Sequence, residues 1–392
     1  MTAGSLYRQG LQAVLLRTIL MSRRGITRSE YILRRVLIIF GCILAILVIL
    51  MATVKIMTIL GRDRLGRNAN TEGPVMREET DSEIRTESVW SSDWQEGWVS
   101  LDGKVYEYND QIRTFLVMGI DDAHNQATDA EVIEKTSGGQ ADGLFLVILN
   151  PLDETIKVLA VNRNTEVPIT LANMGEHDTD VIYDGPIAVQ HAFGGGGEYS
   201  CELTRDAVSN LLFDMPIHAY MSVGYQAIPK INDAIGGVTL TIPEGMDDLL
   251  KINKGWTAGK TITLKGSESV AFVRQRDTEE FESARKRLAR QKLYLTEFIK
   301  QMKVQTKEDI TLPINLYNSM KDYIVTDITV DEMSYLASEY SGYSFDSDGI
   351  YTMEGETFLK EDGFEHFYPD EEALRRLIIQ LFYKEVDRKG AN

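Results

Sequence analysis

The sequence predicts an α/β protein in which helices cover both faces of a mixed central β-sheet, preceded by one transmembrane helix. Two observations carry this prediction. An uncharged apolar run of membrane-spanning length lies near the N-terminus, and strand-like runs alternate with helical patterns beyond it. With 392 residues, 43% of them hydrophobic, the chain is long enough to bury a substantial core.

The apolar run covers residues 36–54, VLIIFGCILAILVILMATV, and contains no charged side chain. A helix needs about 20 such residues to cross the hydrocarbon core, and no convincing cleavage site follows, so we expect an uncleaved span over residues 36–57. Six arginines and one glutamate lie between residues 17 and 35. By the positive-inside rule, residues 1–35 are cytoplasmic and the rest of this single-pass cell-membrane protein is extracellular.

The composition limits the kinds of partner. A net charge of −18 argues against nucleic acid, because that binding rests on broad positive surface. The two cysteines, Cys42 inside the apolar run and Cys201 far beyond it, predict no intramolecular disulfide.

A tether is predicted over residues 58–96, which are polar and show little periodicity. Trp90, Trp94 and Trp98 mark its end, and we interpret them as the packed edge of the next domain. That domain is predicted to cover residues 97–303.

Three strand-like runs open this domain, at residues 113–120, 143–150 and 155–162. The first two are nearly all apolar, as in strands covered on both faces, and the short link NPLDET predicts a hairpin between the second and the third. The sheet is therefore expected to be mixed. Alternating elements follow, with helical patterns at 200–213 and 224–235 and strand-like segments at 217–223 and 236–242.

Residues 304–392 are predicted to form a helical extension packed on the main domain. It contains one strand-like segment at 349–355 and ends in an amphipathic helix at 371–386, EEALRRLIIQLFYKEV. We interpret this part as structural support.

Five arginines lie within residues 272–291, FVRQRDTEEFESARKRLARQ. A solvated helix face with local ion pairs is the simplest interpretation of such a stretch. The spacing favours a binding site instead, because Arg274 and Arg276 alternate and can point at one target. From residue 282 onward the pattern predicts an amphipathic helix with one buried stripe, formed by Leu288, Leu295, Ile299 and Met302.

Arg287, Arg290 and Gln291 lie beside that stripe, whereas Arg285 and Lys286 are expected at the surface. Planar guanidinium groups that converge from two elements, together with an amide, suit a phosphate or diphosphate better than a single carboxylate. The sequence therefore predicts an anion-binding site.

Polar residues also stand at the ends of the predicted strands. Asp121 and Asp122 follow the first strand, Asp142 opens the second and Arg163 closes the third. For any one aspartate, a turn or cap is the more common role. Two carboxylates beside an arginine cluster can hold a hard divalent cation such as Mg²⁺, so Asp121 and Asp142 are the metal candidates.

Two other features carry no site. The glycine-rich run FGGGGEYS at 193–200 lacks the Gly-Lys-Ser/Thr ending of a nucleotide-binding loop, so it is interpreted as a turn before a helix. His191 has no second histidine or cysteine at metal-ligand spacing, and a packed or surface role is expected.

Several segments, in this order and spacing, resemble the LytR-CpsA-Psr family over about residues 97–303. They are FLVMGID, QADGLFLVILNP, LAVNRNTEV, HAFGGG, YMSVGYQAIPKINDAIGGVTLTIP, LKGSESVAFVRQRD and RLARQ. The resemblance implies a membrane-anchored, Mg²⁺-dependent phosphotransferase. Members of that family move a glycopolymer from a polyprenyl-diphosphate carrier to a peptidoglycan sugar hydroxyl in Gram-positive cell walls.

The resemblance also implies site residues. Arg163, Arg274 and Arg276 would be catalytic; these three arginines would also bind the diphosphate, together with Arg287, Arg290, Gln291 and Gln140. Asp121 and Asp142 would hold the metal. The sequence departs from the family pattern at Gln140, where arginine is usual, at Asn164, where aspartate is usual, and at Pro186, near a usual lysine. These departures leave an alternative open, a non-catalytic protein of the same fold that binds lipid diphosphate or wall glycan.

Overall fold

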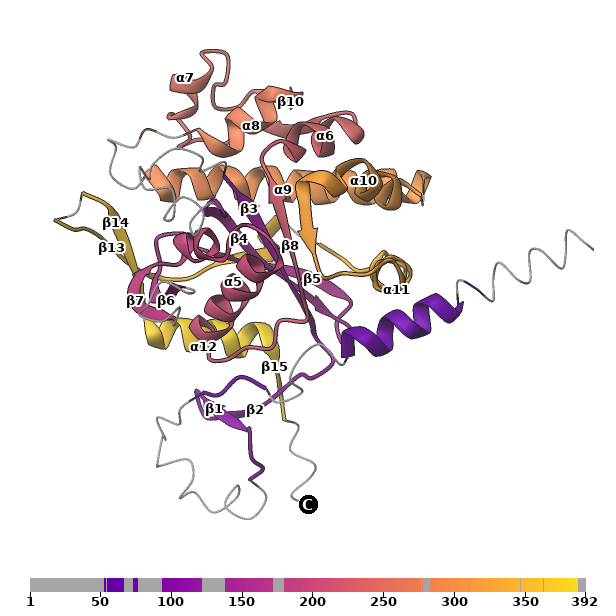
Figure 1. Cartoon of the computed structure of the whole chain (residues 1–392), viewed down its shortest axis with the longest axis vertical. Coiled ribbons are helices and arrows are strands. Elements are labelled where there is room, and N and C mark those ends of the chain that lie inside the picture. Colours follow the sequence, from indigo (N-terminus) through magenta and orange to yellow (C-terminus); the bar gives the residue numbers. More distant parts are fainter. Residues whose placement is uncertain are drawn as a thin grey trace, which may run out of the picture. The chain divides into compact units, whose positions relative to one another are not determined.

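A six-stranded sheet forms the centre of the described part of the chain in the computed structural model, with the strand order β11-β8-β3-β4-β5-β12. Figure 1 labels four of its strands, β3, β4, β5 and β8. Its strands are β3 (Arg113–Ile120), β4 (Ala141–Asn150), β5 (Thr155–Val161), β8 (Ala219–Gly224), β11 (Ile324–Thr326) and β12 (Ile350–Thr352). The structure describes residues 53, 55–66, 73–76, 94–121, 138–171, 180–275, 277, 283–309, 311–345, 347–361 and 363–386.

The three central strands match the predicted runs. β3 has the predicted bounds, and β4 begins two residues earlier than predicted. β4 and β5 form the predicted hairpin, with Leu144 opposite Val161. β3 is antiparallel to β4 but parallel to β8, and β12 is parallel to β5, so the sheet is mixed, as predicted. Leu116 and Leu144 are fully buried on one face, and Phe115 and Leu149 are buried on the other, which agrees with strands covered on both faces.

Helices cover both faces of this sheet, which confirms the predicted layering. One face packs against the 3₁₀ helix η2 (Ile187–Gly194), α5 (Glu198–Leu211) and α12 (Glu371–Phe382). The other face packs against α9 (Ser283–Glu308) and α11 (Val330–Tyr340). The hairpin of β6 (Glu166–Leu171) and β7 (Val181–Pro186) extends the first layer.

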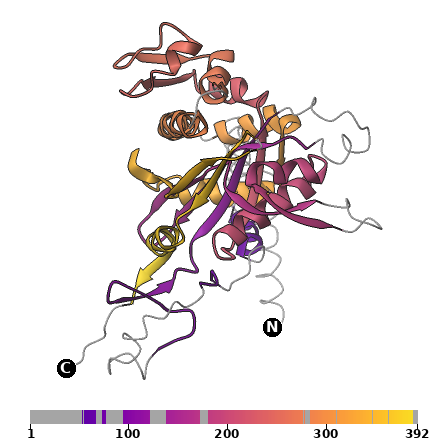
Figure 2. The same ribbon diagram turned by 90° about the vertical axis from the view of Figure 1, so that its left-hand side faces the viewer.

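A small lobe packs on the outer side of α9. It contains a ribbon of β9 (Val238–Thr241) and β10 (Thr261–Leu264) and three helices, α6 (Ala227–Ala234), α7 (Leu249–Ile252) and α8 (Ser267–Arg274). Figure 2 shows α9 nearly end-on between this lobe and the sheet. The predicted single stripe on α9 is therefore wrong. Leu288, Leu295 and Ile299 face the sheet, whereas Met302 packs on the lobe, because the helix lies between two apolar surfaces.

The last 90 or so residues complete the main sheet, because β11 and β12 are its two edge strands. The predicted boundary at residue 303 falls inside α9, which continues to Glu308. The predicted final helix ends at Phe382, since Tyr383–Glu385 forms β15 and pairs with β2. The remaining elements are β1 (Val99–Leu101), β2 (Lys104–Tyr108), α10 (Leu312–Met320), η3 (Lys321–Tyr323), η4 (Ser347–Gly349), β13 (Gly355–Leu359) and β14 (Glu365–Pro369).

Most of the predicted N-terminal segments cannot be compared with the structure. The cytoplasmic stretch 1–35, nearly all of the predicted span 36–57 and much of the tether, with Trp90, lie outside the described residues. Within the described ranges, no helix combines the length and the apolar character that a membrane crossing needs. Trp94 and Trp98 do pack together, with their ring centroids 6.1 Å apart.

Candidate active site

Four strands bring polar residues to one edge of the sheet. β3 and β8 run parallel and end side by side, with Ile120 opposite Gly224, so Asp121 and Tyr225 both follow at this edge. β4 is antiparallel to β3 and therefore begins there, with Asp142 as its second residue. β5 runs back along β4 and delivers Arg163 to the same edge. Ligand sites form at such edges because side chains there are not covered by the neighbouring layer.

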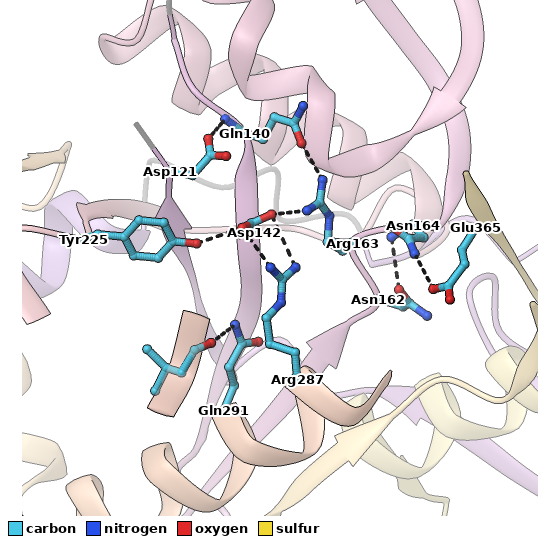
Figure 3. Close-up of polar contacts among 11 residues, drawn as sticks. Asp121, Gln140, Asp142, Asn162, Arg163, Asn164, Tyr225, Arg287, Gln291 and Glu365 are labelled. Carbon is cyan, nitrogen blue, oxygen red and sulfur yellow. Dashed lines mark hydrogen bonds and ion pairs between the residues drawn. The ribbon is translucent and has the colours of Figure 1, made fainter. Parts of the chain in front are cut away.

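The Asp142 carboxylate lies at the centre of this group (Figure 3). It is only 8% exposed, and both of its oxygens accept hydrogen bonds. The phenol oxygen of Tyr225 donates to Oδ2 at 2.8 Å. Arg287 Nη1 donates to Oδ2 at 3.0 Å, Arg287 Nη2 lies 3.4 Å from Oδ1, and Arg163 Nη1 also donates to Oδ1. Two guanidinium groups from distant parts of the chain are thus fixed by one carboxylate.

Arg163 is held from two sides. Besides its bond to Asp142, its Nη2 donates to the side-chain oxygen of Gln140. Burial lowers the pKa of the Arg163 guanidinium, and the Asp142 carboxylate opposes this shift. Its Nε is buried without a hydrogen-bond acceptor among the described residues. A buried donor without a partner is costly, so this N–H is suited to an oxygen of a bound ligand.

Tyr225 connects this group to the end of α8. The Arg274 guanidinium lies over its ring, 4.4 Å from the centroid, and is otherwise exposed. Burial raises the pKa of Tyr225, and the Asp142 carboxylate raises it further, so the phenol stays protonated and donates. Arg274 therefore presents its charge at the open side of the group.

Asp121 lies beside Gln140, whose backbone N–H donates to Asp121 Oδ1 at 2.5 Å. This contact depends on Gly139, which has a φ of +72°. Any other residue at this position would place its Cβ 2.2 Å from the Asp121 carbonyl oxygen, which is too close. Three guanidiniums and two carboxylates make up the group formed by Asp121, Asp142, Arg163, Arg274 and Arg287, here called the arginine cluster. Its net charge is positive, which suits an anionic ligand.

The other predicted site residues lie apart from the Asp142 contacts. Gln291 donates to the backbone oxygen of Val273 at 3.2 Å. Arg290 is fully buried on another side of α9, where it contacts Asp248 and the backbone oxygen of Gln275. Arg276 and Asp122 lie outside the described residues. Arg285 is exposed, as predicted, while Lys286 is half-buried.

The predictions from sequence did not include Tyr225, although a signal for it exists. It lies two residues after the strand-like segment 217–223, close to a strand end as Asp121 is. Asn164 is also engaged unexpectedly, because its amide donates to Glu365 on β14 at 3.3 Å. That partner lies 201 residues away, and no local pattern indicates it.

His191 is buried, which agrees with the packed role and not with the surface role that the sequence left open. Its Nδ1 lies 2.7 Å from the Gly138 carbonyl oxygen. Cys201 is a buried free thiol. Neither residue belongs to the arginine cluster.

The predicted metal pair does not fit a divalent cation in this arrangement. Each oxygen of Asp142 already accepts two hydrogen bonds from guanidinium or phenol donors, which occupy both of its lone pairs, whereas a metal ligand needs a free lone pair. Asp121 offers Oδ2, which accepts no hydrogen bond from a described residue. Across the described ranges, no group of three or more His, Cys, Asp or Glu residues is arranged to hold a metal.

The first testable consequence concerns Asp121. Burial raises the pKa of its carboxyl, and the neighbouring Asp142 carboxylate adds to this, against the hydrogen bond from Gln140. Because the pKa of Asp121 is higher in the folded than in the unfolded protein, the folded protein binds the proton more tightly. Stability therefore falls as the pH rises from the unfolded-state pKa through the folded-state pKa. We therefore expect Asp121→Asn to be more stable than the wild type at pH 7, as measured by thermal unfolding between pH 4 and pH 8.

The exposed Asp247 provides a control, because Asp247→Asn should change the melting temperature at pH 7 only slightly. An Asp121→Asn variant that melts below the wild type at pH 7 would show that the cluster needs the charge of Asp121 for its stability.

Comparisons with known proteins agree with this fold. A model of the LytR_cpsA_psr family matches residues 69–381. Polyisoprenyl-teichoic acid–peptidoglycan teichoic acid transferase TagU of Halalkalibacterium halodurans is 28% identical over 209 residues, which are 53% of this chain and 62% of that protein. TagU of Bacillus cereus is 26% identical over 272 residues, 68% of this chain and 77% of that protein. The crystal structure of TagV from B. subtilis superposes with a TM-score of 0.51 and 24% identity, covering 69% of this chain and 95% of that chain.

Proposed function

The chain belongs to the LytR-CpsA-Psr family, and on that premise we propose that it is a membrane-anchored phosphotransferase. In this proposal it moves a glycopolymer from a polyprenyl-diphosphate carrier to a sugar hydroxyl of peptidoglycan, outside a Gram-positive cell. The names of two relatives support the reaction class, because both are transferases that act between polyisoprenyl-teichoic acid and peptidoglycan.

One observation carries the proposal. The buried guanidinium of Arg287 and the partly buried one of Arg163 share Asp142, Arg163 has an unpaired Nε, and a third guanidinium lies at the open side over Tyr225. This arrangement offers several directed donors with excess positive charge at a single place, as the two phosphates of a diphosphate require.

The reaction asks little covalent chemistry of the protein. The acceptor hydroxyl attacks the phosphorus that carries the glycan and loses its proton to water. The bond from that phosphorus to the bridging oxygen breaks, and polyprenyl phosphate leaves with the electron pair of that bond. Arg163 and Arg287 would hold non-bridging oxygens, and Arg274 would neutralise charge on the leaving phosphate. Positioning and charge neutralisation then supply most of the rate.

Magnesium remains part of the proposal in a limited form. When bound, it would neutralise charge on the diphosphate oxygens. Asp121 is the residue with a carboxylate oxygen available to it, whereas Asp142 would first have to lose guanidinium contacts. We therefore propose that Asp142 positions Arg163 and Arg287 rather than binding the metal. No catalytic step in this proposal depends on the metal.

A second candidate function is binding without turnover. It is favoured by Gln140 and Asn164, neutral residues at positions where the family usually has charges, because both side chains are bound to protein partners. Such a protein would hold lipid diphosphate but release no polyprenyl phosphate.

Transfer of a lipid-diphosphate-linked glycan to peptidoglycan fragments, followed by chromatography of the products, distinguishes the two functions. We expect turnover by the wild type and a loss of about 10- to 100-fold in Arg274→Ala, the effect of one charge-assisted contact. Arg285→Ala is the control, since this arginine lies on an exposed face of α9. Binding of geranyl diphosphate without any turnover would favour the second candidate.

A further inference from the structure

The 3₁₀ helix η2 connects the two backbone segments that hold Arg163. At the start of this helix, the Ala188 backbone N–H donates to the Arg163 carbonyl oxygen at 3.1 Å. Near its end, the Ala192 carbonyl oxygen accepts a hydrogen bond from the Gly138 N–H at 3.4 Å, two residues before Gln140. Figure 3 shows the Gln140 side chain, which accepts a hydrogen bond from the Arg163 guanidinium. The backbone and the side chain of Arg163 are therefore both linked to one short helix.

His191 is the η2 residue whose side chain adds to this connection. It is buried, and its Nδ1 lies 2.7 Å from the Gly138 carbonyl oxygen and 3.2 Å from the Gly139 carbonyl oxygen. Because a carbonyl oxygen only accepts hydrogen bonds, Nδ1 must carry the proton and donate it to these two oxygens. The ring thus holds the two residues that directly precede Gln140.

The other ring nitrogen, Nε2, is left as an acceptor. Cys201 Sγ lies 3.7 Å from it, and burial raises the pKa of this thiol to about 11, so its S–H is present to donate. Burial also lowers the pKa of the His191 ring, against the hydrogen bonds to the two glycine carbonyls. The ring is therefore neutral at pH 7 and keeps the tautomer that donates to Gly138 and Gly139.

The packing around this contact leaves the backbone before Gln140 little freedom. Gly138 approaches η2 so closely that a Cβ at this position would lie 2.3 Å from the His191 carbonyl oxygen. Beyond it, the Gln140 N–H donates to Asp121 Oδ1, and the Gln140 side-chain oxygen accepts from Arg163. A shift of the Gly138 backbone would therefore move a hydrogen-bond partner of Arg163.

We propose that His191 is a positioning residue, which holds the backbone before Gln140 so that Arg163 is oriented toward the diphosphate. The inference rests on the proposed function and deepens it, since it explains how a residue outside the arginine cluster orients one of its guanidiniums. Asp142 holds Nη1 of Arg163 and Gln140 holds Nη2. Because the guanidinium is planar, these two contacts also fix the direction of Nε, the donor without an acceptor among the described residues.

Three variants of the full chain separate positioning from packing. His191→Leu keeps a similar size and loses the donor, whereas His191→Asn places an amide N–H near the position of Nδ1. His218→Leu is the matched control, because His218 is also buried but lies where β3 and β8 begin, with its Nδ1 2.9 Å from Thr114 Oγ1. Thermal unfolding measures the stability of each variant. If His191→Leu does not fold, His191→Gln takes its place, because its amide lies near the position of Nε2 rather than Nδ1.

The first measurement needs no ligand. Phenylglyoxal modifies accessible arginines, and mass spectrometry of the peptides gives separate rates for Arg163 and Arg287. We expect His191→Leu to raise the rate at Arg163 about 3- to 10-fold, the effect of one weakened hydrogen bond, and to leave the rate at Arg287 unchanged. His191→Asn and His218→Leu should both keep the wild-type rate at Arg163.

The second measurement is calorimetric titration with geranyl diphosphate. His191→Leu should weaken binding about 3- to 10-fold, while His191→Asn and His218→Leu should bind as the wild type does. An unchanged Arg163 rate or an unchanged affinity in folded His191→Leu overturns the proposal. An equal loss in His218→Leu overturns it too, because a general loss of packing would then explain the effect.

The failure of the proposed function gives a different result. A wild type that does not bind geranyl diphosphate contradicts the diphosphate assignment. The phenylglyoxal rates still decide whether His191 positions Arg163, because that measurement contains no diphosphate.

Discussion

Asp142→Ala is expected to lower the free energy of unfolding by about 3–5 kcal/mol, the usual cost of removing one partner from a buried ion pair. The substitution leaves the Arg163 and Arg287 guanidiniums close together without their shared carboxylate, and it removes the acceptor of the Tyr225 phenol. Chemical denaturation of the purified chain measures the change.

Two comparisons separate charge from shape. Asp142→Asn keeps the size and one acceptor oxygen, so it should fall between the wild type and the alanine variant. Asp206→Ala removes an exposed carboxylate paired with Arg205 and should cost less than about 1 kcal/mol. Equal effects of the Asp142 and Asp206 variants would mean that the buried carboxylate does not organise the cluster.

Arg287→Ala and Arg287→Lys should both weaken the binding of geranyl diphosphate by about 10- to 100-fold, which corresponds to about 1.5–3 kcal/mol for a hydrogen bond to a charged group. The residue is 3% exposed, and its side chain contacts Asp142 through both terminal nitrogens. A lysine cannot reproduce this planar fork, so restoring the charge alone should not restore affinity.

Calorimetric titration at constant ionic strength measures this effect, with Arg285→Ala as the control on the same helix. Thermal unfolding of each variant excludes a general loss of structure. Full affinity in a folded Arg287→Lys variant would indicate that charge alone is sufficient and that the fork geometry is unimportant.

The central strands could be predicted because their signal is local. β3 is bounded as the apolar run 113–120 indicates, and the short link after Asn150 leaves a hairpin as the natural connection. The edge strand β12 lies within the strand-like segment predicted at 349–355, whereas the edge strand β11 has three residues, too few for a periodic pattern to mark it. Their pairing depends on contacts with distant parts of the chain, which a local sequence pattern does not contain.

The site was predicted in its residue types more than in its geometry. Asp121, Asp142 and Arg163 stand at strand ends, where polar residues in a covered sheet are conspicuous. The joint contact of Asp142 with Arg287 spans 145 residues, and spacing along the chain does not determine it. The contacts of Arg290 could not be predicted for a similar reason. Its helix lies between the sheet and the lobe, and a helical pattern alone does not indicate which of the two a side chain contacts.

The most direct test of the central claim is mass spectrometry of both products of one transfer reaction. The wild-type chain is incubated with a lipid-diphosphate-linked glycan and peptidoglycan fragments. Our account predicts that the lipid leaves as a monophosphate and that the peptidoglycan product carries the glycan through one phosphate. Release of the lipid as an intact diphosphate, with the glycan attached to peptidoglycan without phosphorus, would contradict phosphotransfer at the arginine cluster.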